Sequence, residues 1–118
     1  MAVADRVPLA EAAAVFVFNG PSSSGKTSLC SALQSRLVQA HQHLQLDAFR
    51  AMEPAGYWDD WERQPPNLVA RRLAALCRAM NAAVSAYLRH GLPVLLDVAL
   101  THPESWRYLL EDLADLPV

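Results

Sequence analysis

The sequence predicts an α/β fold in which a parallel sheet lies between two layers of helices, with three strands present in the chain. Short apolar runs alternate with helical patterns along the 118 residues. Strand–helix–strand units of this kind form parallel sheets through right-handed connections. A glycine-rich segment joins the first apolar run to the first helical pattern, and an aspartate lies near the end of each later run. Ligands of such folds bind at the carboxyl ends of the strands.

The first strand is predicted at Val15–Asn19, and its continuous apolar character is typical of a central strand covered on both faces. The next segment matches G-x-x-x-x-G-K-[ST], the phosphate-binding P-loop, in which backbone N–H groups surround phosphates. The predicted nucleotide-binding residues are Gly20, Pro21, Ser22, Ser23, Ser24, Gly25, Lys26, Thr27 and Ser28. Lys26 would reach the β- and γ-phosphates of a nucleotide, and the Thr27 hydroxyl would bind Mg²⁺. The chain has four glycines and one lysine, so their use here favours a nucleoside-triphosphate site over a turn without a ligand.

A helix is predicted from about residue 25 to residue 41. Its apolar face is expected to contain Leu29, Leu33, Leu37 and Val38, with Cys30 beside them. Residues 41–43 are interpreted as a polar turn. Their two histidines have no third metal ligand nearby in the sequence, so we do not assign a metal site to them.

A short second strand is predicted at Leu44–Asp47, followed by a helical turn at Ala48–Met52. Residues 53–67 have an irregular composition and contain Tyr57, Trp58 and Trp61. Long loops in compact domains often line binding sites. The alternative is that these aromatic side chains cover the core from outside.

The longest helix is predicted at Leu68–His90, followed by a third strand at Val94–Ala99 that contains Asp97. A last helix would run from His102 to about Leu113 with Trp106, Leu109 and Leu110 directed inward, and residues 116–118 would approach a fourth strand. The P-loop, Asp47 and Asp97 are therefore expected to meet at one edge of the sheet. Each aspartate would contact Mg²⁺ or a substrate hydroxyl, or else would cap the next helix.

The composition excludes several classes of protein. The net charge of −2 argues against an electrostatic nucleic-acid binder, and no apolar run reaches the length of a membrane span. Cys30 and Cys77 lack metal-like spacing and are interpreted as reduced core residues of a cytoplasmic protein. Residues 1–14 contain Asp5 and Glu11 but no basic region typical of a signal peptide, so they are expected to be a flexible tail before a single domain unit at 15–118.

The segment from Phe18 to Ser28 resembles the P-loop of the chloramphenicol phosphotransferase-like proteins, and residues 46–52 and 79–97 are similar to later parts of that family. The resemblance implies a P-loop kinase-like three-layer sandwich that transfers the γ-phosphate of ATP to a hydroxyl of a small molecule. It implies that Asp47 and Lys26 are catalytic, with Asp47 as the general base. It also implies that Thr27 and Asp97 lie at the metal.

The chain departs from the family pattern in two respects. Val98 stands where the family can carry a second acidic residue, and the expected later strands and arginine-bearing lid do not follow Val118. In the strand order 2-3-1-4-5 this would leave the first strand at an edge, so we interpret the chain as a truncated member. Two alternatives to a kinase remain: a nucleotide-binding module without turnover, and an interaction protein that self-associates through its open sheet edge.

Overall fold

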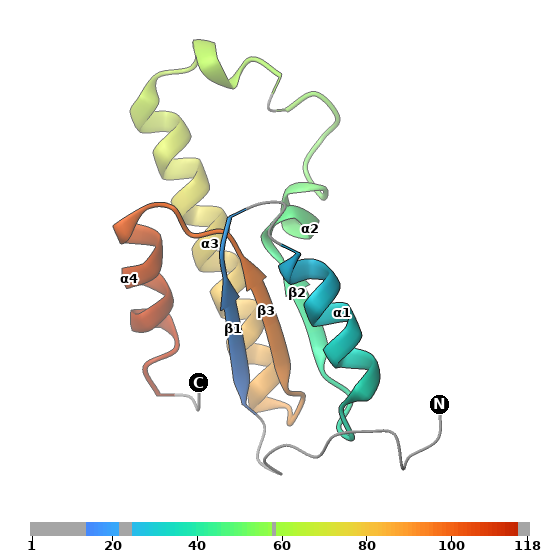
Figure 1. The fold of residues 1–118 in the computed structure, drawn as a ribbon. Helices are drawn as coiled ribbons and strands as arrows, with labels where there is room; N and C mark the ends of the chain where they lie inside the picture. Colours follow the sequence, from blue (N-terminus) through green and yellow to red (C-terminus); the bar gives the residue numbers. More distant parts are fainter. Residues whose placement is uncertain (1–13, 22–24, 58, 116–118) are drawn as a thin grey trace.

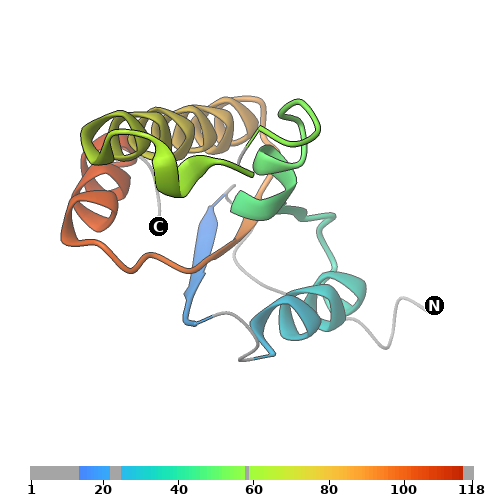
Figure 2. The same cartoon turned by 90° about the horizontal axis from the view of Figure 1, so that it is seen from above.

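The computed structural model describes residues 14–21, 25–57 and 59–115. Within these ranges three parallel strands lie between helices (Figure 1). The elements are β1 (Val15–Asn19), α1 (Lys26–Arg36), β2 (Gln42–Gln45), α2 (Leu46–Arg50), the 3-10 turn η2 (Trp61–Arg63), α3 (Pro66–Arg89), β3 (Val94–Val98) and α4 (Pro103–Asp112). Seen from above, α1 lies on one side of the sheet and α3 on the other, with α4 beside α3 (Figure 2). The α/β fold with a parallel sheet is therefore confirmed.

The strand order is β1-β3-β2, so β3 is the central strand of the sheet that the structure describes. Val15 pairs with Val94 and Leu44 pairs with Leu96. Since side chains alternate between the two faces of a strand, these apolar residues share one face. The buried core on that face also includes Met80 and Val84 of α3 and Leu109 of α4.

The opposite face of the sheet is more polar and is covered by α1. By the same alternation it carries His43, Leu95 and Asp97. Cys30, on the inner side of α1, is fully buried. One face of β3 thus belongs to the apolar core and the other supports a buried carboxylate.

The prediction that β1 is a central strand covered on both faces is wrong for the part of the chain that the structure describes. There β1 pairs with β3 alone and forms an edge, as the strand order 2-3-1-4-5 predicts. Phe16 remains partly exposed on it. The continuous apolar run correctly indicated a strand, but it did not determine how many neighbours that strand has.

The helix predicted to reach residue 41 ends at Arg36. Leu37 has an extended backbone, and its side chain is buried while its N–H still bonds to the carbonyl of Leu33. The expected apolar face is also partly wrong, because Leu29 is 55% exposed and Val38 is exposed as well. Only a narrow side of α1, centred on Cys30, meets the sheet.

The second strand starts earlier than predicted. The N–H of Gln42 donates to the carbonyl of Pro93 at 2.8 Å, which starts the pairing with β3. His43 is therefore a strand residue and not part of a polar turn, whereas Leu46 and Asp47 already belong to α2. Polar side chains are tolerated at these positions because β2 lies at the edge of the described sheet.

The helices α3 and α4 largely follow the predicted ranges. Cys77 is buried and, like Cys30, is a free thiol, as expected. In α4, Leu109 is buried, but Leu110 is 60% exposed and Trp106 is also exposed. The inward orientation predicted for these two residues is wrong, because α4 packs mainly along α3 and buries only a narrow stripe. Residues 1–13 of the tail predicted at 1–14, and the approach to a fourth strand predicted at 116–118, lie outside the described residues. None of the described helices is long and apolar enough to cross a membrane.

Candidate functional site

The start of the loop that follows β1 is held against β3 by two hydrogen bonds. The N–H of Gly20 donates to the carbonyl of Val98 at 3.2 Å, and Asn19 Oδ1 accepts a hydrogen bond from the N–H of Leu100 at 2.9 Å. The loop thus starts between the carboxyl ends of β1 and β3. Three of the predicted phosphate-binding residues, Ser22, Ser23 and Ser24, lie outside the described residues.

Gly25 determines how α1 begins. It caps the helix with φ of +86°, a conformation that a residue with a side chain adopts only at a cost. A Cβ atom at this position would meet nothing within 4 Å, so the backbone angle and not crowding requires glycine. Helix α1 then starts at Lys26. The N–H groups in the first turn of a helix have no partner within the helix and favour an anion.

Asp97 is the centre of the polar cluster at this end of the sheet. Thr27 Oγ1 donates to Asp97 Oδ2 at 2.7 Å, and Lys26 Nζ lies 3.4 Å from Oδ1. His43 Nε2 lies 3.1 Å from Oδ2. The Asp97 side chain is only 2% exposed, so these contacts replace the water that a carboxylate would otherwise bind.

The electrostatics of the cluster favour the ionised carboxylate. Burial alone would raise the pKa of Asp97, but the hydrogen bonds from Thr27 and His43, with the hydrogen bond and charge of Lys26, outweigh burial and hold that pKa below its usual value. The pKa of the Cys30 thiol changes in the other direction. Burial raises it, and so does the nearby Asp97 charge, against a smaller opposing effect of Lys26.

Asp47 reaches the same site from α2. A cavity of about 240 Å³ lies at the carboxyl ends of the strands, and its lining includes Lys26, Thr27, Asp47, Arg50, Asp97 and Thr101. The predicted convergence of the P-loop and the two aspartates at one edge is thus observed. Asp47 nevertheless lies in the first turn of α2 and not at the end of a strand, and the cap of that helix is Gln45. Neither aspartate occupies a helix cap.

Sequence reasoning missed Cys30 and His43 as members of this cluster. Both were interpreted as ordinary residues, but their ligand atoms and those of Asp97 all lie within 4.8 Å of one another. The register explains this proximity, since His43 pairs with Leu95, two residues before Asp97, and therefore shares its face. A strand predicted at residues 42–45 would have placed His43 on the same face as Asp97, although not Cys30, which lies on α1.

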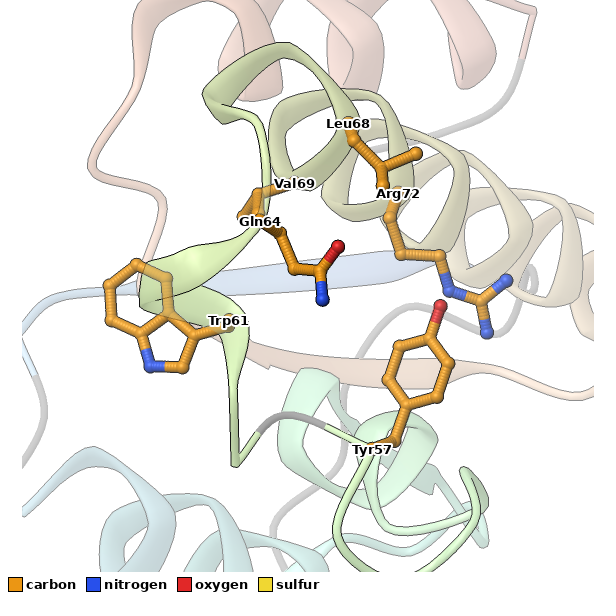
Figure 3. Close-up of a pocket in the computed structure, with 6 residues that line it drawn as sticks. All are labelled: Tyr57, Trp61, Gln64, Leu68, Val69 and Arg72. Carbon is orange, nitrogen blue, oxygen red and sulfur yellow. The ribbon is translucent and has the colours of Figure 1, made fainter.

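A second cavity, of about 250 Å³, lies between the loop after α2 and the start of α3 (Figure 3). Tyr57 and Arg72 lie together at one side of it, and Trp61 lies at the other. The Arg72 guanidinium stacks 5.0 Å from the centre of the Tyr57 ring and lies 3.6 Å from the carboxylate of Glu53, whose side chain is 6% exposed. Tyr57 and Trp61 are both exposed, so they line this cavity and do not cover the core. Trp58 lies outside the described residues.

The fold is that of the P-loop kinase-like class: a parallel sheet flanked by helices, with Lys26 and Thr27 at the carboxyl ends of the strands. The family model of the chloramphenicol phosphotransferase-like proteins matches residues 13–118, and the chain belongs to this family. No curated protein matches the chain in sequence. Membership in the family indicates a kinase-like phosphotransferase, a class that generally uses ATP and Mg²⁺.

Proposed function

We propose that the chain binds ATP with Mg²⁺ and transfers the γ-phosphate to a hydroxyl group of a small molecule. The observation that carries this proposal is the single cavity that receives Lys26, Thr27, Asp47 and Asp97 from three separate elements. In the proposal, the P-loop backbone and Lys26 bind the phosphates. Phosphoryl transfer depends mostly on positioning and charge stabilisation, so few further groups are needed.

The proposed metal ligands are Thr27 and Asp97. Their oxygen atoms are 2.7 Å apart, close to the separation of about 2.9 Å between adjacent oxygens around Mg²⁺ when each Mg–O distance is about 2.0–2.1 Å. A hydroxyl and a carboxylate are also the oxygen donors that this ion prefers. When bound, Mg²⁺ would neutralise charge on the β- and γ-phosphates. Thr27 would then exchange its hydrogen bond to Asp97 for the ion.

Asp47 is the proposed general base. Its side chain lines, from α2, the cavity of about 240 Å³ at the carboxyl ends of the strands, called the phosphate cavity from here on. Arg50 on the same helix lines it too. In a loose transition state the acceptor hydroxyl loses its proton late, so a carboxylate is a sufficient base. The side chain of Arg50 would supply positive charge next to the transferred phosphoryl group.

The proposed acceptor is an aromatic or otherwise apolar alcohol. Support comes from the second cavity, whose lining combines Tyr57 and Trp61 with the apolar side chains of Leu68 and Val69. The loop that carries the two aromatic residues rises beyond the carboxyl ends of the strands (Figure 1). An acceptor held there would lie at the same end of the sheet as the phosphate cavity, the end where the strands have their carboxyl termini.

The test is a phosphoryl-transfer assay with ATP labelled at the γ-phosphate. Chloramphenicol is the first acceptor to use because the family bears its name, and a panel of small aromatic alcohols follows. We expect Asp47→Asn to lower the rate by about 100-fold or more. Asp60→Asn, which removes an exposed carboxylate from the neighbouring loop, should leave the rate unchanged.

Unchanged turnover in Asp47→Asn would contradict the proposed base. If the unaltered chain binds ATP but phosphorylates no acceptor, the proposal of catalysis fails. The alternative of a nucleotide-binding module without turnover would then take its place.

A further inference from the structure

The buried cluster of Cys30, His43 and Asp97 has the composition of a transition-metal site. A thiol, an imidazole and a carboxylate come together from α1, β2 and β3, and their ligand atoms lie within 4.8 Å of one another. Nitrogen and sulfur donors select Zn²⁺ over Mg²⁺, which prefers oxygen alone. Three protein ligands with one open position are a common arrangement around protein-bound Zn²⁺.

We propose that Cys30, His43 and Asp97 bind one Zn²⁺ ion and that this ion competes with the magnesium nucleotide for Asp97. A thiolate, a carboxylate and a neutral imidazole carry two negative charges together, which balance the charge of the ion. The thiol proton of Cys30 passes to solvent when the sulfur–zinc bond forms. The open position of the ion would take a water molecule or a phosphate oxygen.

The geometry requires only small side-chain movements. His43 Nε2 and Asp97 Oδ2 are already 3.1 Å apart. Around a tetrahedral Zn²⁺, neighbouring ligand atoms lie about 3.3–3.7 Å apart for bond lengths of about 2.0–2.3 Å. No separation in the cluster therefore has to shorten by more than about 1.5 Å. Asp97 also lines the phosphate cavity, so the ion would reach the cluster from that cavity.

Occupation of this site would change the contacts of Asp97. Its carboxylate accepts the hydrogen bond of Thr27 and pairs with Lys26. A doubly charged ion bound to the same carboxylate would repel the Lys26 ammonium group and remove the proposed magnesium ligand. Inhibition by zinc rests on the proposed function, whereas metal binding itself does not.

The experiment titrates the reduced chain, without an affinity tag, with Co²⁺ as a spectroscopic substitute for Zn²⁺. We expect one equivalent to give the visible absorption of tetrahedral cobalt with a thiolate-to-cobalt band in the near ultraviolet, and Zn²⁺ to remove both. Cys30→Ser should abolish the thiolate band, and Cys77→Ser is the matched control because Cys77 is also a buried free thiol. His43→Gln should weaken binding at least about 100-fold, since even the loss of an outer-shell partner costs about 10–100-fold.

Octahedral cobalt absorption alone in the unaltered chain would overturn the proposal, as would a thiolate band that survives Cys30→Ser. If Cys30→Ser does not fold, His43→Gln decides, because unchanged cobalt affinity in this variant also overturns it. ATP binding is then measured with and without Zn²⁺. Failure to bind ATP without zinc would refute the proposed function, while the cobalt spectra would still decide the metal site.

Discussion

Replacement of Asp97 by asparagine tests whether the buried carboxylate holds the site together. The carboxylate accepts a hydrogen bond from Thr27 at 2.7 Å and lies 3.4 Å from the Lys26 ammonium group. Asparagine keeps the shape and one acceptor oxygen, but it loses the charge. Lys26, whose side chain is 15% exposed, then lacks a charged partner at this position. We expect the free energy of unfolding to fall by about 1.5–3 kcal/mol, the contribution of a hydrogen bond to a charged group.

The effect of Asp97→Asn on stability should depend on pH. The folded state holds the pKa of Asp97 below its ordinary value, so the ionised carboxylate stabilises the fold. That contribution is complete above the unfolded pKa, near pH ~4, and is lost as the pH falls through the lower folded value. The difference in stability between Asp97→Asn and the unaltered chain should therefore be full at pH 7 and should shrink at acidic pH.

Urea unfolding followed by circular dichroism is the assay. With a slope of about 1–3 kcal/mol per molar urea, the expected loss shifts the midpoint by about 1 M at pH 7. Asp115→Asn removes the same charge from an exposed position and should change stability by less than about 0.5 kcal/mol. Equal stability of Asp97→Asn and the unaltered chain at pH 7 would refute the reasoning, because the lost charge would then have had no favourable partner.

Two further predictions concern the loop glycine and the contact between α3 and α4. Gly25→Ala should cost about 1–2 kcal/mol because of the positive φ and should also weaken ATP binding in calorimetry. Gly91→Ala, with φ of +79° and equally open space around it, should cost a similar amount but leave ATP affinity unchanged. Equal ATP affinities of the two variants would contradict a role of the Gly25 loop in binding the nucleotide. Asp112 accepts a hydrogen bond from buried Asn81 at 3.0 Å, so Asp112→Ala should destabilise the chain by about 1–3 kcal/mol. Glu111→Ala, at an exposed neighbour, should change stability by less than about 1 kcal/mol in the same urea experiment, and equal losses would contradict this account.

The central elements of the fold could be predicted from the sequence because their signals are local. The apolar run at β3 and the long run of helical periodicity at α3 predict these elements nearly at their observed bounds. The glycine and lysine pattern likewise predicted a turn into a helix after β1, and α1 begins there at Lys26. The exposed Leu29 and Leu110 show the limit of such patterns. Periodicity identifies an apolar stripe but does not determine how wide a surface a neighbouring element offers to cover it.

The site was predictable where it depends on the chain direction of parallel strands. The meeting of Lys26, Asp47 and Asp97 follows from that direction alone. The approach of His43 to Asp97 depends on register, and the polar strand β2 carries little apolar signal from which register could be inferred. The position of Cys30 near the same carboxylate depends further on the rotation of α1 over the sheet. Tertiary packing determines this rotation, and no local pattern gives it.

The most direct test of the account is calorimetric binding of ATP with Mg²⁺ to the chain and to its Lys26→Ala variant. The account predicts saturable binding by the unaltered chain and a loss of affinity of at least about 10-fold in the variant, since one charge-assisted contact contributes about 1.5–3 kcal/mol. Folding of the variant is checked by circular dichroism. Absence of ATP binding by the unaltered chain, or equal binding by the folded variant, would contradict the claim that this cavity is a nucleotide-phosphate site.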